Sequence, residues 1–144
     1  MADAFLSAAP TFLVPDVERT VAWYEEMLGF EVMTSMRGHG EGQDDSADDH
    51  HDHSGPIVFA ILQRDEVAIM FATTTEAVRP NRMVAGASDA VDLYVWMDDD
   101  EALGAFLADC QQKGLVSRPL EHTPYDMVEF AILDCDGRTL TFGA

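Results

Sequence analysis

The chain contains an internal repeat of a strand, a helix and three further strands, and this repeat limits its fold more than any other feature. The segments LVPDVERTVAWYEEMLGFEV and VWMDDDEALGAFLADCQQKGLV align with Asp16 over Asp99 and Trp23 over Phe106. Repeats of this size indicate two copies of one supersecondary unit that pack together. Because 144 residues is the length of one ordinary domain, we expect a single α+β domain, residues 1–144, built from two modules.

The first module is predicted over about residues 5–73. Asp16 follows a short strand and is a good N-cap for a helix, which Gly29 ends as a C-terminal glycine does. The apolar stripe on this helix recurs at helical spacing. An acidic, histidine-rich insert at 38–55 interrupts the module. The expected strands lie at 11–14, 30–36, 57–63 and 67–73, the last two as a hairpin.

The second module is predicted over residues 91–144, after a connector at 74–90 that contains Pro80 and Gly86 and has no firm periodicity. The acidic run Asp98–Asp100 offers a cap to the helix that follows, which ends near Gly114. The expected strands lie at 91–97, 116–121, 127–133 and 138–142.

The charge of the chain excludes two classes of partner. Eight basic residues against 27 acidic ones give a net charge of −19. Such a surface repels nucleic acid and anionic membranes and attracts cationic ligands. A solubility adaptation, for example to high salt, also explains this charge and is the simpler explanation. No apolar run approaches the roughly 18 residues of a membrane span. The N-terminus does not read as a signal peptide, and two distant cysteines form no disulfide framework, so we expect a cytoplasmic protein.

Three fragments carry a resemblance to a known family. FLVPDVERTVAWYEEMLGFEV resembles the first strand-helix-strand of the vicinal oxygen chelate superfamily, the group of glyoxalases, bleomycin-resistance proteins and ring-cleaving dioxygenases. VDLYVWMDDDEALGAFLADCQQKG resembles the second such unit, and YDMVEFAILDCDGRTLTFG the closing hairpin. The resemblance implies paired βαβββ modules, mixed sheets that each curl around a cleft, and a homodimer. Cys135 departs from it, because the family generally has proline in that turn.

The resemblance also marks four positions at which metal-using members carry His or Glu. They fall on Ala9, Met70, Asp92 and Thr141, of which only Asp92 is a suitable ligand for a hard divalent ion. A catalytic ion needs about three protein ligands, so we expect no metal cofactor. The alternative is a divalent ion held by Asp92 and Glu129 with a histidine from the insert. Because glycines flank the insert and its charges repel one another, we expect it to be a mobile loop. Its candidate ligands are His50, His51 and His53.

Strand alternation predicts which side chains face the cleft. Asp92, Tyr94 and Trp96 share one side of their strand, and Glu129 lies on the cleft side of another. Aromatic rings beside carboxylates suit a flat, partly cationic molecule. Each residue has a rival interpretation: Trp96 as core, Tyr94 in a dimer interface, Asp92 as solvent-exposed, and Glu129 as a structural carboxylate bonded to backbone amides or an arginine. The predicted ligand-binding residues are Thr11, Met70, Asp92, Tyr94, Trp96, Glu129 and Thr141.

Two functional hypotheses follow from these residues and the resemblance. The first is a metal-independent binding protein of bleomycin-resistance type, which sequesters an aromatic or cationic compound in a dimer cleft and thereby confers antibiotic resistance. The second is a divalent-metal-dependent lyase or dioxygenase of the same superfamily. We assign no catalytic residue, because no nucleophile motif is present. An interaction domain with a vestigial cleft remains a third possibility.

Overall fold

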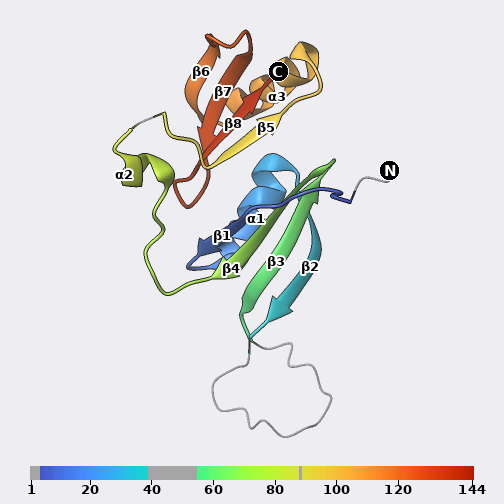
Figure 1. The fold of residues 1–144 in the computed structure, drawn as a ribbon. Coiled ribbons are helices and arrows are strands. Elements are labelled where there is room, and N and C mark those ends of the chain that lie inside the picture. The colour runs from blue at the N-terminus through green and yellow to red at the C-terminus, as the bar shows by residue number, and fades with distance from the viewer. Residues whose placement is uncertain (1–3, 39–54, 88) are drawn as a thin grey trace, which may run out of the picture. The chain divides into compact units, whose positions relative to one another are not determined.

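The computed structural model describes residues 4–38, 55–87 and 89–144. The chain divides into two compact units, Met1–Ala77 and Val78–Ala144, each with one four-stranded mixed sheet and a helix against one of its faces (Figure 1). The predicted α+β fold with two βαβββ modules is therefore confirmed. Residues 78–90, most of the predicted connector, belong to the second compact unit. Residues 39–54 of the histidine-rich insert predicted as a mobile loop, with His50, His51 and His53, lie outside the described residues.

In the first unit, the helix is held by the caps that the sequence predicts. The carboxylate of Asp16 accepts a hydrogen bond of 3.0 Å from the backbone amide of Arg19. Gly29 follows the last turn with φ of 70°, a left-handed conformation that glycine adopts without steric cost. The elements are β1 (Thr11–Val14), α1 (Val17–Leu28), β2 (Glu31–Arg37), β3 (Ile57–Arg64) and β4 (Val67–Thr73). The sheet order is β1-β4-β3-β2, with β1 parallel to β4.

The core of the first unit lies between α1 and one face of its sheet. Tyr24 is completely buried, and its ring lies 4.9 Å from that of Phe71 and 5.6 Å from that of Phe30. Trp23, its neighbour in the helix, is only half-buried. The residue that corresponds in packing to the buried Phe106 of the second unit is thus Tyr24, one position beyond the residue that the repeat alignment indicates.

The second unit repeats this arrangement after an additional short helix. Its elements are α2 (Asn81–Ala85), β5 (Leu93–Trp96), α3 (Asp100–Gln112), β6 (Val116–His122), β7 (Val128–Leu133) and β8 (Thr139–Gly143). The sheet order is β5-β8-β7-β6, with β5 parallel to β8 (Figure 1). The side chain of Asp99 caps α3 by accepting from the amide of Ala102 at 2.8 Å. Phe106 of α3 packs against the sheet, 4.7 Å from the ring of Phe142 and 6.0 Å from that of Phe130.

The helix α2 is a feature that the sequence pattern did not indicate. Five residues are too few for an apolar period to be visible. Its N-terminus is tied to the second unit, because the backbone amide of Asn81 donates to Asp92 at 3.0 Å. The guanidinium of Arg82 donates to the carbonyl of Gly137 at 3.1 Å. No helix among the described residues is long and apolar enough to cross a membrane.

Candidate functional site

The candidate site lies on the face of the second sheet that α3 does not cover. Tyr94 of β5 stands beside Thr141 of β8, and Thr141 stands beside Ala131 of β7. Glu129 of β7 is the partner of Gly143. Because side chains alternate between the faces of a sheet, Phe130 and Phe142 point to α3 while these residues share the opposite face. The shared face predicted for Tyr94 and Glu129 is confirmed by a direct hydrogen bond between them.

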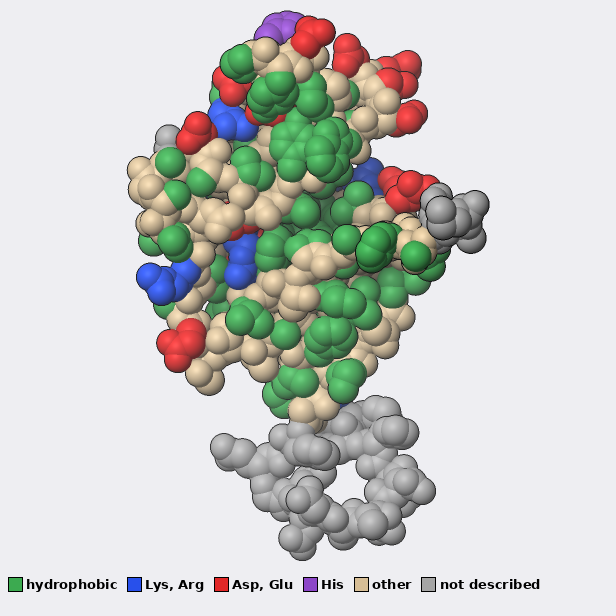
Figure 2. Space-filling view, in the orientation of Figure 1, with side chains coloured by type: hydrophobic (Ala, Val, Ile, Leu, Met, Phe, Trp, Pro, Cys, Tyr) green, Lys and Arg blue, Asp and Glu red, His purple; other side chains and the backbone are tan. Residues whose placement is uncertain are grey.

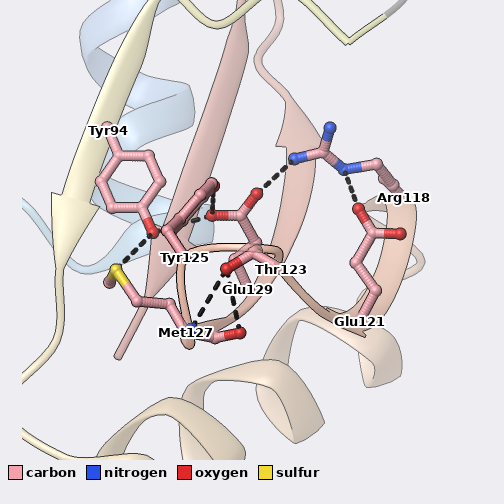
Figure 3. A network of polar contacts seen from close by, with 7 residues as sticks. All are labelled: Tyr94, Arg118, Glu121, Thr123, Tyr125, Met127 and Glu129. Atoms are coloured by element: carbon pink, nitrogen blue, oxygen red, sulfur yellow. Dashed lines mark hydrogen bonds and ion pairs between the residues drawn. The ribbon is translucent and has the colours of Figure 1, made fainter.

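The centre of the site is the carboxylate of Glu129, which is only 6% exposed. Its Oε2 atom accepts hydrogen bonds of 2.8 Å from the hydroxyls of both Tyr94 and Tyr125 (Figure 3). Its Oε1 atom lies 3.4 Å from Nη2 of Arg118, and Arg118 also forms an ion pair of 3.5 Å with Glu121. A buried carboxylate is costly unless donors surround it. These three partners therefore allow Glu129 to remain beneath the surface.

Tyr94 is fixed more firmly than its single strong hydrogen bond implies. Its hydroxyl lies against the backbone of Gly143, where any larger residue would place its Cβ atom, and it also contacts the sulfur of Met127 at 3.9 Å. Burial and the hydrogen bond to Glu129 raise the pKa of Tyr94 well above that of an ordinary tyrosine. The phenol thus remains a protonated donor at any physiological pH.

Tyr125 reaches the same oxygen from a turn between β6 and β7. The turn is closed by Thr123, whose amide donates to the carbonyl of Met127 at 2.8 Å and whose hydroxyl accepts from the amide of Met127 at 3.1 Å. Asp126 adopts a left-handed φ of 61° within it. The hydrogen bond to Glu129 is the largest cause of a raised pKa for Tyr125. The ring nevertheless remains 59% exposed.

Exposed aromatic surface adjoins this carboxylate. Trp96 is 74% exposed, and its ring centroid lies 5.2 Å from that of Tyr94 at an interplanar angle of 54°. In the second unit, acidic side chains gather at the outer margin of the face shown in Figure 2, with hydrophobic side chains inside them. An exposed indole is a strong cation–π partner, and a nearby carboxylate adds direct attraction for a positive charge. The arrangement can therefore hold an aromatic or cationic group.

Two threonine hydroxyls on the same face have unused bonding capacity. Thr139 and Thr141 are buried, and neither Oγ1 atom has a hydrogen-bond partner among the described residues. A buried hydroxyl without a partner is unfavourable. Both atoms lie beneath the surface, so they carry an unfavourable term in the folded chain and are not exposed to a ligand.

The remaining predicted residues have other contacts. Both carboxylate oxygens of Asp92 accept backbone hydrogen bonds, at 3.0 Å from Asn81 and at 2.9 Å from Thr139. Thr11 and Met70 belong to the first unit, where the hydroxyl of Thr11 lies 3.7 Å from the sulfur of Met70. Asp92 is thus anchored to the connector and β8, while Thr11 and Met70 bond to each other.

The positions that the resemblance marks for a metal do not fit one. Ala9 has no donor atom, Met70 offers a thioether, and the hydroxyl of Thr141 is fully buried. Asp92 alone carries a carboxylate, and backbone amides already use both of its oxygens. Within residues 4–38, 55–87 and 89–144, no three His, Cys, Asp or Glu side chains gather in a way that could hold a metal ion.

Arg118, Tyr125 and Met127 join the site without having been predicted as site residues. The pairing of β6 with β7 is irregular on both sides of Arg118. Two-residue alternation therefore does not predict which face of the sheet its side chain occupies. Tyr125 lies in a turn, where no period applies. One sequence feature could have indicated Tyr125. It lies four residues before Glu129, and the tight hairpin turn brings the two side chains onto one face.

Known structures resemble the whole chain. The bleomycin-binding protein from Streptomyces verticillus, solved with copper(II)-bleomycin, is 20% identical with a TM-score of 0.61, over 99% of this chain and 97% of that one. A glyoxylase/bleomycin resistance protein/dioxygenase domain from Frankia sp. is 16% identical with a TM-score of 0.66, over 98% and 92%. A lactoylglutathione lyase from Agrobacterium tumefaciens is 12% identical with a TM-score of 0.59, over 95% and 92%.

These neighbours share the fold, and at such identities they establish no more than the fold. No curated protein matches the sequence. A family model does match, over residues 8–142, which is nearly the entire chain. The chain therefore belongs to the Glyoxalase/Bleomycin resistance protein/Dioxygenase superfamily.

Proposed function

We propose that this protein is a metal-independent binding protein for a small aromatic cation, and that Glu129 with Trp96 and Tyr94 forms its binding site. The observation that carries the proposal is a buried carboxylate linked through Tyr94 to a tryptophan that is 74% exposed: the Tyr94 hydroxyl donates to Glu129 at 2.8 Å, and its ring lies 5.2 Å from that of Trp96. A soluble protein gains nothing for its own core from an indole in that position, whereas a ligand that covers it gains a cation–π contact.

The charge of the chain supports a cationic ligand over an anionic one. The net charge of −19 raises the local concentration of cations and speeds their association. The residues at the family's metal-ligand positions support binding without a metal, since alanine, methionine and threonine occupy three of the four positions. The bleomycin-bound neighbour supports sequestration of a drug-like compound as the biological role. We include a homodimer in the proposal and expect sedimentation to give twice the mass of one chain.

The test is a calorimetric titration with ligands of similar shape that differ in charge and in hydrogen-bond donors. Benzamidine is a planar cation, and benzamide is its neutral counterpart of nearly the same shape. We expect saturable binding of benzamidine and of phenyltrimethylammonium, with benzamide at least about fivefold weaker, because one close charge interaction is worth about 1 kcal/mol or more at a partly buried site. Bleomycin belongs in the same series.

Two variants separate a specific site from the general attraction of an acidic protein. Glu129→Gln and Glu121→Gln each remove one negative charge. Only Glu129 is buried and bonded to the two tyrosines, whereas the Glu121 side chain is exposed and forms an ion pair with Arg118. Glu129→Gln should weaken binding of phenyltrimethylammonium about tenfold, and Glu121→Gln should change it less than twofold. Equal effects of both variants would show that net charge, and not this site, holds the cation.

A further inference from the structure

The acceptor sites on Glu129 are almost fully occupied, and this occupation has a consequence for the kind of ligand the site takes. A carboxylate offers about four lone-pair positions, two on each oxygen. Oε2 accepts from Tyr94 and from Tyr125, both at 2.8 Å, so both of its positions are in use. Oε1 has Arg118 at 3.4 Å as its partner among the described residues, so one position on it is open.

The two tyrosines that share Oε2 differ in how easily they can leave it. Tyr94 stands on β5 with its hydroxyl against Gly143 and Met127. Tyr125 stands on the turn after β6, and its ring is 59% exposed. The turn itself is closed by the two bonds between the Thr123 side chain and the backbone of Met127, and Thr123 also offers a hydrogen bond to the Tyr125 hydroxyl. Rotation of Tyr125 away from Glu129 therefore gives up its own side-chain bonds and leaves the Thr123–Met127 bonds that close the turn in place.

We propose that Tyr125 is a displaceable occupant of the site, and that its departure admits a ligand with two parallel N–H donors, such as an amidinium or guanidinium group. Such a group binds a carboxylate through one hydrogen bond to each oxygen. Oε1 can accept one of these bonds as it stands, whereas Oε2 can accept the other only after Tyr125 has left. The released phenol keeps its proton and bonds to water. This inference rests on the proposed function and adds the ligand's donor geometry to it.

The two tyrosines consequently have opposite expected effects, although their bonds to Oε2 have the same length. Tyr125→Phe removes the competing donor on the exposed side, so it should raise the affinity for benzamidine about threefold to tenfold. Tyr94→Phe frees a position that lies against the backbone of Gly143, where a ligand cannot reach it. It should leave the affinity for benzamidine unchanged or lower.

The experiment measures the ratio of affinities for benzamidine and phenyltrimethylammonium by calorimetry, for the wild-type chain and each variant. Phenyltrimethylammonium has the same charge and no N–H donor, so Tyr125→Phe should leave its affinity within twofold and raise the ratio. Tyr125→Leu, which also lacks the hydroxyl, should raise the ratio too, and it keeps the test decisive if one variant folds poorly.

Two other results would overturn the inference. The first leaves the proposed function standing, and the second refutes it as well. If the wild-type chain binds both cations and Tyr125→Phe leaves the ratio unchanged or lowers it, Tyr125 is no competitor and the proposed function stands. If neither cation binds the wild-type chain or either Tyr125 variant, the cation site itself is wrong, and the inference falls with the proposed function.

Discussion

Gly143 lies at the end of β8, and its replacement by alanine tests the geometry of the site most sharply. Glycine inside a strand or helix usually destabilises by about 0.5–1 kcal/mol relative to alanine. On that ground alone Gly143→Ala should stabilise the protein. In the structure, however, the alanine Cβ atom would occupy the place of the Tyr94 hydroxyl and lie 3.4 Å from the Cβ atom of Glu129.

The magnitude follows from what Tyr94 must give up. Its ring can turn away from a new Cβ atom, but the hydroxyl then loses its 2.8 Å bond to the buried carboxylate of Glu129. A hydrogen bond to a charged group contributes about 1.5–3 kcal/mol. After subtraction of the usual gain from alanine, Gly143→Ala should lower the free energy of unfolding by about 1–2 kcal/mol.

The assay is chemical denaturation of Gly143→Ala beside a matched control, Gly104→Ala. Gly104 lies in α3, and a Cβ atom there would meet nothing within 4 Å. Gly104→Ala should therefore raise the free energy of unfolding by up to about 1 kcal/mol, which is the difference in helix propensity between glycine and alanine. In a Tyr94→Leu background, Gly143→Ala should lose most of its cost. If Gly143→Ala stabilises the wild-type chain as much as Gly104→Ala does, Tyr94 does not stand where the argument requires.

Three further predictions concern individual side chains of the site. Thr141→Val replaces a buried hydroxyl that has no partner among the described residues. It should therefore raise the unfolding free energy by about 1 kcal/mol in denaturation experiments, and a loss of stability would contradict this. Trp96→Leu should change stability by less than about 0.5 kcal/mol, because the indole is exposed, yet abolish calorimetric binding of phenyltrimethylammonium; retained affinity would remove Trp96 from the site. The pKa values of Tyr94 and Tyr125 are raised above the value of about 10 in an unfolded chain. Their contribution to stability is therefore complete below pH of about 10 and is lost as the pH rises toward the folded-state values. Absorbance titration of the phenols should show both ionising at lower pH in Glu129→Gln, and unchanged titration would contradict the assigned cause.

The sequence predicted those features that depend on local chemistry. Asp16 and Asp99 cap helices because each precedes an amphipathic run, and Gly29 ends one because only glycine enters the left-handed region freely. Alternation also placed Tyr94 and Glu129 on one face, since regular pairing holds along β5, β8 and β7. Helix caps depend on residues adjacent in sequence, and the face of a strand residue depends on two-residue alternation. Both can be recognised in the amino-acid sequence.

The features that escaped prediction depend on irregular backbone or on contacts distant in sequence. The pairing irregularities of β6 remove the period that would have placed Arg118 beside Glu129. Asp92 looked like a ligand for a cation because its two backbone partners, Asn81 and Thr139, lie 11 and 47 residues away. The rival interpretation of Glu129, as a carboxylate paired with an arginine, describes its contact with Arg118. That contact is compatible with binding, because Oε1 retains an acceptor position.

The central claim is that a cation binds against Trp96 under the control of Glu129. The chain has two tryptophans, so Trp23→Phe leaves Trp96 as the only indole and its fluorescence as a direct report on the site. Titration of this variant with phenyltrimethylammonium should give a saturable change in emission, and the additional change Glu129→Gln should shift its midpoint about tenfold upward. A Trp96 emission that does not respond to the cation, or a midpoint indifferent to Glu129→Gln, would contradict the account.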